Sequence, residues 1–248
     1  MEKTRFSGVK NIVRFNWHYY LIASIVVLVL LLCGYFAPDT LIFPILAILT
    51  FLATVLSLAV SAYIYDFSPL YEFKWLDTRF TGNRIVNIHA GFDETSYLLK
   101  RRYPEAQFSM FDFYDPEQHT EVSIERARRA FPPPSETIKV ATSNIPLAKK
   151  STDIIFLILA AHEIRKQKER VSFFKSLSNS LSPAGKIVVI EHLRDLNNFV
   201  AFNAGFFHFF SRNSWMTTFR KANLEVNTEF KITPFLSVFI LQNNGDAS

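Results

Sequence analysis

The hydrophobic positions of the chain follow one pattern before residue 66 and another after it. Residues 17–37 and 41–65 form two apolar runs, and neither 19–37 nor 41–65 contains a charged side chain. A helix needs about 20 residues to cross the hydrocarbon core of a bilayer. We therefore predict a hairpin of two transmembrane helices, closed by a tight turn at residues 38–40.

The charges that flank these runs predict the orientation of the hairpin. Residues 1–16 form a basic tail with four cationic side chains, whereas the connecting turn contains only Asp39. Because positively charged flanks stay in the cytoplasm, we expect a multi-pass protein of the cytoplasmic (inner) membrane whose remaining domain faces the cytoplasm. A cleaved signal peptide is the alternative interpretation. The second apolar run and the lack of a small-x-small cleavage site argue against it.

After a linker helix expected within residues 66–82, short apolar runs alternate with amphipathic stretches over residues 83–242. The run 153–160 is almost entirely apolar, as is typical of a strand buried on both faces of a parallel sheet. The expected strands are 85–88, 107–111, 137–141, 153–160, 186–190, 225–231 and 235–241; the expected helices are 69–80, 94–102, 116–130, 168–181 and 213–222, and 243–248 is a tail. We therefore predict an α/β, Rossmann-like sheet of seven strands that ends in an antiparallel hairpin.

Composition and charge limit the possible partners. The chain is 49% hydrophobic with a mean hydropathy of +0.13, which fits a membrane protein, and its net charge is +5. Its basic residues occur in short clusters without interleaved aromatic residues, so we expect no nucleic-acid partner. We interpret the clusters as solvated surface; attraction to anionic lipid headgroups is the alternative. The clusters lie at residues 100–102, 126–129, 149–150 and 165–168.

The first expected strand leads directly into a turn that contains Gly91 and then into a helix. A strand that delivers such a turn to a helix N-terminus commonly binds nucleotides in open α/β sheets. A nicotinamide-dependent reductase would need G-x-G-x-x-G here, and residues 89–93 do not supply it.

The order of elements resembles the class I S-adenosylmethionine-dependent methyltransferase family over residues 75–241. The best local matches are 181–192 (LSPAGKIVVIEH), similar to the family's LkPGG-strand-E segment, and 144–155, similar to its LPf…sFDvv segment. Residues 91–96 and 191–198 also resemble membrane-anchored bacterial relatives associated with pigment and aryl-lipid pathways. The resemblance implies S-adenosyl-L-methionine as cofactor.

The resemblance also implies which residues contact the cofactor. The four positions of the family's first motif are Asn87, His89, Gly91 and Asp93, so only the middle glycine of three is present. Asp112 matches the acid that binds the ribose hydroxyls, a role suited to a carboxylate that accepts two hydrogen bonds. A helix N-cap is the alternative role for an Asp at this place. The acid expected near the adenine falls at Ala141, and the remaining cofactor positions are Phe113, Asn144 and Ala160.

Several histidines follow the expected strands, where α/β sheets bind their ligands. They are His89, His162 and His192, with His208 in the connection beyond, and Glu163 and Glu191 adjoin two of them. Each alone is expected to be a structural residue, but together they form a rim capable of acid–base chemistry, because histidine titrates near neutral pH. We predict no metal site, since no i,i+4 pair or Cys/His spacing indicates one.

Methyl transfer to oxygen requires a deprotonated acceptor. We therefore expect His192 or His208 to take the proton of an aromatic hydroxyl, with Asp195 orienting the imidazole. Residues 199–210 contain six phenylalanines, which indicates a lid over a lipophilic substrate or a foot at the membrane interface, with core packing as the alternative. The hypothesis is a membrane-anchored methyltransferase for a lipophilic aromatic alcohol. The competing hypothesis is a membrane-tethered scaffold that keeps the fold without catalysis.

Overall fold

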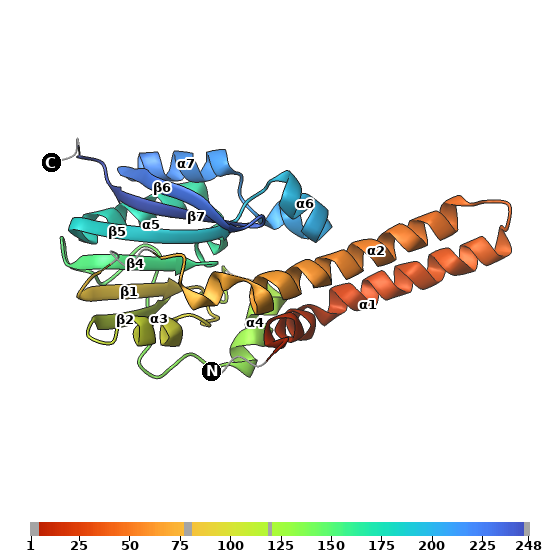
Figure 1. Cartoon of the computed structure of the whole chain (residues 1–248), viewed down its shortest axis with the longest axis horizontal. Helices are drawn as coiled ribbons and strands as arrows, with labels where there is room; N and C mark the ends of the chain where they lie inside the picture. The colour runs from red at the N-terminus through yellow and green to blue at the C-terminus, as the bar shows by residue number, and fades with distance from the viewer. Residues whose placement is uncertain (1–4, 77–80, 119–120, 246–248) are drawn as a thin grey trace.

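The computed structural model describes residues 5–76, 81–118 and 121–245. A hairpin of two long helices projects from one edge of a layered α/β domain (Figure 1). The helices of this hairpin are α1 (Ser7–Phe36) and α2 (Ile42–Ala62). Helix α1 begins ten residues before the first expected span, so most of the basic tail is helical from Ser7 on, with non-helical backbone angles at Asn16.

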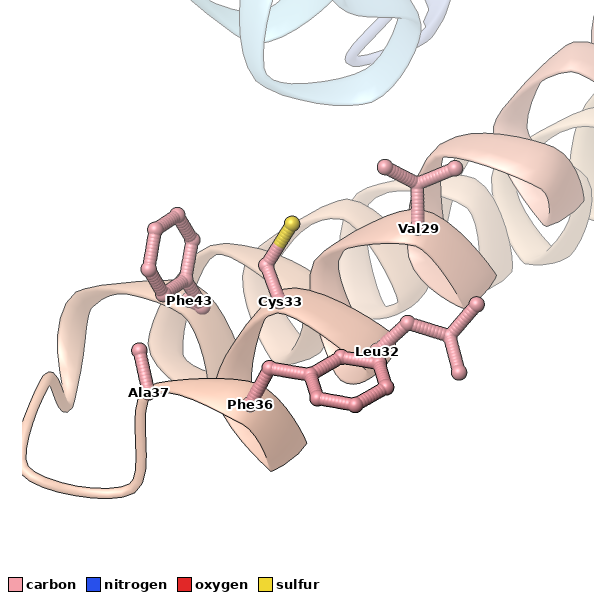
Figure 2. Close-up of a pocket in the computed structure, with 6 residues that line it drawn as sticks. All are labelled: Val29, Leu32, Cys33, Phe36, Ala37 and Phe43. Carbon is pink, nitrogen blue, oxygen red and sulfur yellow. The ribbon is translucent and has the colours of Figure 1, made fainter.

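Both helices are long and apolar enough to cross a membrane. Their most apolar windows have only 0% and 6% of their residues buried within the molecule, unlike a core helix of a soluble protein. Near the tip of the hairpin, apolar side chains line a shallow hollow (Figure 2). Because this hollow contains only hydrocarbon groups and the Cys33 thiol, it carries no candidate chemistry.

Helix α2 passes into the domain through two short turns. A π-helical turn, η1 (Tyr63–Phe67), is followed by the 3₁₀ turn η2 (Pro69–Glu72), and Phe73 then adopts a left-handed conformation with φ of 53°. Such a residue cannot continue a helix. The linker helix expected over residues 69–80 is therefore wrong in the described residues, and its last four positions lie outside them.

The sheet has seven strands in the order β3-β2-β1-β4-β5-β7-β6. The first five strands run parallel, and β7 pairs antiparallel with both β5 and β6, so the expected fold class is confirmed. The strands are β1 (Arg84–His89), β2 (Gln107–Asp112), β3 (Ile138–Lys139), β4 (Thr152–Ile158), β5 (Leu181–His192), β6 (Leu224–Thr233) and β7 (Leu236–Asn243). Strand β5 is much longer than the five residues expected for it.

Alternating residues of β4 supply the two hydrophobic cores. Ile155 and Leu157 pack in the core that contains the aromatic side chains of α5 and α7, whereas Ile154 and Phe156 pack in the core on the other face. The linker covers that second face with Ile64, Leu70 and Phe73. The helices of the domain are α3 (Ser96–Arg102), α4 (Val122–Ala130), α5 (Gln167–Ser180), α6 (Leu196–Phe202) and α7 (Arg212–Lys221), with 3₁₀ turns η3 (Ala161–Glu163) and η4 (Asn203–His208).

The base of the hairpin packs against the carboxyl end of the parallel strands. The Asp66 carboxylate accepts hydrogen bonds from the first amides of α1, at 2.7 Å from Gly8 and 2.9 Å from Val9. The ring of Phe15 contacts Phe92, in the loop after β1, with 5.8 Å between centroids. The guanidinium of Arg126 on α4 donates to the carbonyl of Phe15 at 2.7 Å. The edge of the sheet that binds ligands in α/β proteins therefore faces the apolar hairpin.

This packing predicts that Gly8 accepts no side chain. A Cβ there would lie 2.6 Å from the Cβ of Tyr65 and 3.0 Å from its carbonyl carbon, so the helices would have to separate. We expect Gly8→Ala to lower the free energy of unfolding by about 1–3 kcal/mol, as overpacked cores do. Thermal unfolding of the full chain in detergent measures this.

Gly34→Ala is the matched control, because its Cβ would meet no atom closer than 3.3 Å. Equal unfolding midpoints for the two variants would contradict the tight contact between α1 and η1.

Candidate active site

Two groups of polar side chains lie at the carboxyl ends of the parallel strands. The first surrounds the loop after β1 and the end of β2. The second, which we call the histidine–carboxylate cluster, follows β4 and β5 and consists of Glu121, His162, Glu163, Glu191 and His208.

In the first group, Asn87 and Asp93 hold the loop after β1. The amide nitrogen of Asn87 donates to the hydroxyls of Thr95 and Ser96 at 3.0 and 2.8 Å, and its oxygen has no partner among the described residues. The carboxylate of Asp93 accepts from the backbone amides of Thr95 and Ser96 at the start of α3. Gly91 between them has φ of +96°, which favours glycine.

The imidazole of His89 is buried between two carboxylates. Its Nε2 lies 3.9 Å from Asp93 and its Nδ1 lies 3.8 Å from Asp112, and neither nitrogen makes a hydrogen bond within the described chain. Burial lowers the pKa of His89, although both carboxylates oppose this effect. The ring is therefore held neutral, with polar atoms that a ligand can engage.

Asp112 is paired within the protein. Its carboxylate accepts a hydrogen bond from the amide of Tyr114 at 2.9 Å and forms an ion pair with Arg128 of α4. The same guanidinium donates to the carbonyl of Gly91 at 3.2 Å and stacks on the ring of Tyr114. A Cβ added to Gly91 would lie 3.0 Å from both Ile124 and Tyr114. Helix α4 therefore covers the glycine loop.

Sequence reasoning missed Arg128. The interpretation of the cluster at 126–129 as solvated surface is wrong for Arg126, bound to α1, and for Arg128, bound to Asp112. Basic residues on a short amphipathic helix give no signal for which of them turns inward. Only the packing of α4 over the loop after β1 brings the guanidinium to the carboxylate.

The other three expected cofactor residues occupy different environments. The ring of Phe113 is buried against Phe173, and Ala160 is buried in the same core. Asn144 is exposed in a tight turn, where its amide donates to the carbonyl of Ala141 at 3.0 Å. Their contact with a cofactor remains a prediction.

The histidine–carboxylate cluster brings together residues that are far apart in the sequence. His162 Nδ1 lies 2.6 Å from Glu191 Oε2, and His162 Nε2 lies 3.1 Å from Glu163 Oε1. His208 Nε2 lies 3.5 Å from the same oxygen of Glu163, and His208 Nδ1 lies 2.8 Å from Glu121 Oε1. The structure thus brings together four of the residues expected at the rim, and Glu121 joins them.

A strained turn directs His162 toward its partners. Leu159, directly after β4, has φ of 52°, a conformation that side chains other than glycine rarely adopt. Its amide is held by the carbonyl of Ile190 at 2.9 Å. The chain then forms η3, and the amide of His162 donates to Glu191 at 3.1 Å. Strain of this kind concentrates at functional sites.

The carboxylates control the charge of the cluster. Burial would lower the pKa of His162, but Glu191 and Glu163 outweigh it and hold that pKa well above its usual value. Burial would also lower the pKa of His208, but Glu121 and Glu163 outweigh this effect, so that the pKa of His208 is raised. Burial would raise the pKa of Glu163, but the two histidines outweigh this effect and hold that pKa below its usual value. The cluster therefore favours positive charge between its carboxylates.

His192 lies in a separate, closed network. Its Nε2 pairs with the Tyr65 hydroxyl at 3.1 Å, and its Nδ1 lies 3.1 Å from Asn198 Oδ1 and from the carbonyl of Phe235. Burial lowers the pKa of His192 to about 4. The imidazole thus connects the base of the apolar hairpin to the sheet in its neutral form.

Asp195 does not orient His192 directly. Its carboxylate caps α6 through the amide of Asn198 at 3.0 Å and pairs with Lys231 at 3.0 Å. The side-chain amide of Asn198 donates to Asp195 at 3.0 Å and stands between the two residues. The expected acid–imidazole contact is therefore replaced by an indirect one.

Solved structures provide the class of this fold. An S-adenosylmethionine-dependent methyltransferase from Clostridium acetobutylicum aligns with a TM-score of 0.52 and 10% sequence identity, over 71% of this chain and 90% of that one. The pyocyanin biosynthetic protein PhzM aligns with a TM-score of 0.51 and 14% identity, over 79% of this chain and 58% of that chain. This chain thus matches less than two thirds of PhzM.

No family model and no curated protein matches the sequence. The fold is that of S-adenosylmethionine-dependent methyltransferases, and the strand order with its antiparallel end agrees with the resemblance in the sequence.

The buried neutral state of His192 predicts a pH dependence of stability. Because its folded pKa of about 4 lies below the ordinary value of 6.5, the unfolded chain binds the proton first as pH falls. The stabilisation is complete above pH 6.5 and is lost as pH falls toward 4, by about 3 kcal/mol at 1.36 kcal/mol per pKa unit. We expect His192→Gln to lose less stability than the wild type over this interval, as measured by chemical unfolding at a series of pH values. Parallel curves for both proteins would contradict a neutral buried His192.

Proposed function

We propose that the chain is a membrane-anchored S-adenosylmethionine-dependent methyltransferase, facing the cytoplasm, that methylates a lipophilic acceptor with an aromatic hydroxyl. The observation that carries the proposal is the histidine–carboxylate cluster at the carboxyl end of a methyltransferase-like sheet, beside an exposed apolar hairpin. Open α/β sheets bind ligands at this edge.

The exposed apolar surface supports anchoring in a membrane. Besides α1 and α2, the α6–η4 segment exposes large apolar side chains, with Leu196 at 74% and Phe207 at 64% exposure, and α6 lies beside α2 (Figure 1). Continuity with the hairpin favours the foot at the membrane interface over a core segment. An acceptor dissolved in the bilayer then reaches the carboxyl edge of the sheet without crossing bulk water.

The polar groups after β1 and β2 support a nucleoside cofactor, provided that one side chain moves. Asp112 would accept the ribose hydroxyls, and the unpartnered atoms of Asn87 and His89 would meet polar groups of the ligand. In the present conformation the carboxylate of Asp112 is engaged in an ion pair with Arg128. The residues therefore fit the cofactor only after this guanidinium moves away. When bound, the cofactor supplies the electrophilic methyl group. In this proposal the cluster, at the carboxyl ends of β4 and β5, supplies the carboxylate and imidazole groups that accept the proton of the acceptor hydroxyl.

Binding of S-adenosylhomocysteine tests this proposal. We expect the full chain in detergent to release heat on titration in a calorimeter, and Asp112→Asn to weaken binding about tenfold or more, because hydrogen bonds to a charged group contribute roughly 1.5–3 kcal/mol. Arg128→Ala frees Asp112 and should tighten binding. Arg129→Ala is the control, since Arg129 pairs with Glu125 on the exposed side of the same helix.

The Arg128–Asp112 pair also favours a second candidate function, a membrane-tethered scaffold without catalysis. In that case the guanidinium is a permanent replacement for the cofactor. The absence of heat for both the wild type and Arg128→Ala at high ligand concentration would establish the scaffold and overturn the enzyme.

The foot formed by α6 and η4 makes a separate prediction. In a Cys33→Ser background, we attach a fluorophore at Phe207→Cys. Lipids brominated in their acyl chains should quench it, because position 207 of η4 enters the membrane interface in this proposal. Tyr97→Cys on α3, also highly exposed, is the control and should not be quenched. Equal quenching at both positions, or at neither, would contradict an interfacial α6–η4 segment.

A further inference from the structure

Three ligand atoms of the histidine–carboxylate cluster point toward a common space. One ligand atom from each of His162, Glu163 and His208 lies within 4.8 Å of the other two. The Glu163 oxygen is 3.1 Å from His162 Nε2 and 3.5 Å from His208 Nε2. Ligands of a tetrahedral zinc ion with bonds of 2.0–2.1 Å are about 3.4 Å apart, so the two distances from Glu163 to the histidines are close to those of a metal site.

The opposite nitrogen of each imidazole is held by a different carboxylate. Glu191 lies 2.6 Å from Nδ1 of His162, and Glu121 lies 2.8 Å from Nδ1 of His208. Metal-binding histidines commonly donate their second ring N–H to a carboxylate in this way, which fixes the ring and directs the lone pair of Nε2 at the metal. Both rings of this cluster have that arrangement.

The arrangement leaves a position that needs a cation. When both Nδ1–H groups donate to Glu191 and Glu121, neutral imidazoles direct two lone pairs at the carboxylate of Glu163, with no donor between them. His208 Nε2 makes no hydrogen bond within the described residues. Three carboxylates surround the two rings. The neighbouring Arg165 donates to the backbone carbonyls of His162 and His208 and stacks on the ring of Phe210. Either protons or a metal ion must separate these groups.

We propose that His162, Glu163 and His208 bind a divalent first-row transition metal, with Glu191 and Glu121 positioning the two imidazoles. Two imidazoles and one carboxylate suit zinc, iron, cobalt or nickel better than magnesium or calcium. Three protein ligands leave coordination positions open, as in catalytic sites. His208 has a side-chain exposure of 26%, which gives the ion a path from solvent.

The proposed site was not indicated by the sequence for a topological reason. His162 and Glu163 are adjacent in η3, where the strained turn at Leu159 places them, and His208 arrives from η4, more than forty residues later. No short-range spacing describes such a set.

Metal binding is independent of methyl transfer. Its use rests on the proposed function: an acceptor hydroxyl that fills an open position becomes more acidic on the metal.

Cobalt titration of the full chain in detergent tests the site, after treatment with a chelator and removal of the chelator. We expect one Co²⁺ per chain, with visible ligand-field absorption that Zn²⁺ abolishes by competition. His208→Ala removes a ligand from a partly exposed position and should eliminate the absorption. Glu121→Gln keeps all three ligands and should weaken binding about 10- to 100-fold, the usual loss when an outer partner of a metal-bound histidine is changed.

His18→Gln is the control, because it removes a histidine of α1 outside the cluster, where Arg126 is its partner. It should retain wild-type absorption, and unfolding curves establish that each variant is folded. The proposal is overturned if the wild type shows no Co²⁺ absorption, if folded His208→Ala binds as tightly as the wild type, or if His18→Gln loses binding. None of these measurements depends on S-adenosylhomocysteine, so failure of the metal site and failure of the methyltransferase proposal remain distinct.

Discussion

The contact between the base of the apolar hairpin and the carboxyl end of the sheet determines the rest of this structure. Asp66 caps the start of α1, while Ile64 and Leu70 enter the core under β4 and β5. The hairpin is therefore not a tether on a flexible linker. Its base is part of the domain's packing, and burial of these side chains stabilises both elements at once.

This contact constrains polar residues at both sides of the carboxyl end of the sheet. Helix α4 is fixed to α1 through Arg126 and Phe15, and it carries Arg128 onto Asp112. At the other end, Tyr65 holds His192 in the sheet. This end of the sheet is consequently covered by side chains that the hairpin helps to hold, which couples the position of the hairpin to access at Asp112.

The histidine–carboxylate cluster shows how a protein keeps like charges together in a partly buried place. Glu191 is fully buried, and such a carboxylate is costly unless it is paired. His162 supplies that pairing through both its backbone amide and its ring. The same ring then faces Glu163 and His208, so the charge balance of the whole cluster depends on what occupies the space between them.

The sequence by itself determined the order of most secondary-structure elements, because periodicity and apolar run length are local properties that can be read without knowing the tertiary contacts. The two long apolar helices, the strand order of the resembled family and the clustering of His162, Glu163, Glu191 and His208 at one edge all followed from it. The partners of those residues did not. Arg128 on Asp112, Glu121 on His208, Tyr65 on His192 and the early end of the linker helix at Phe73 arise from contacts between segments distant in sequence. Only packing in three dimensions decides such contacts, since each depends on which face of a helix turns inward and which strand end it meets.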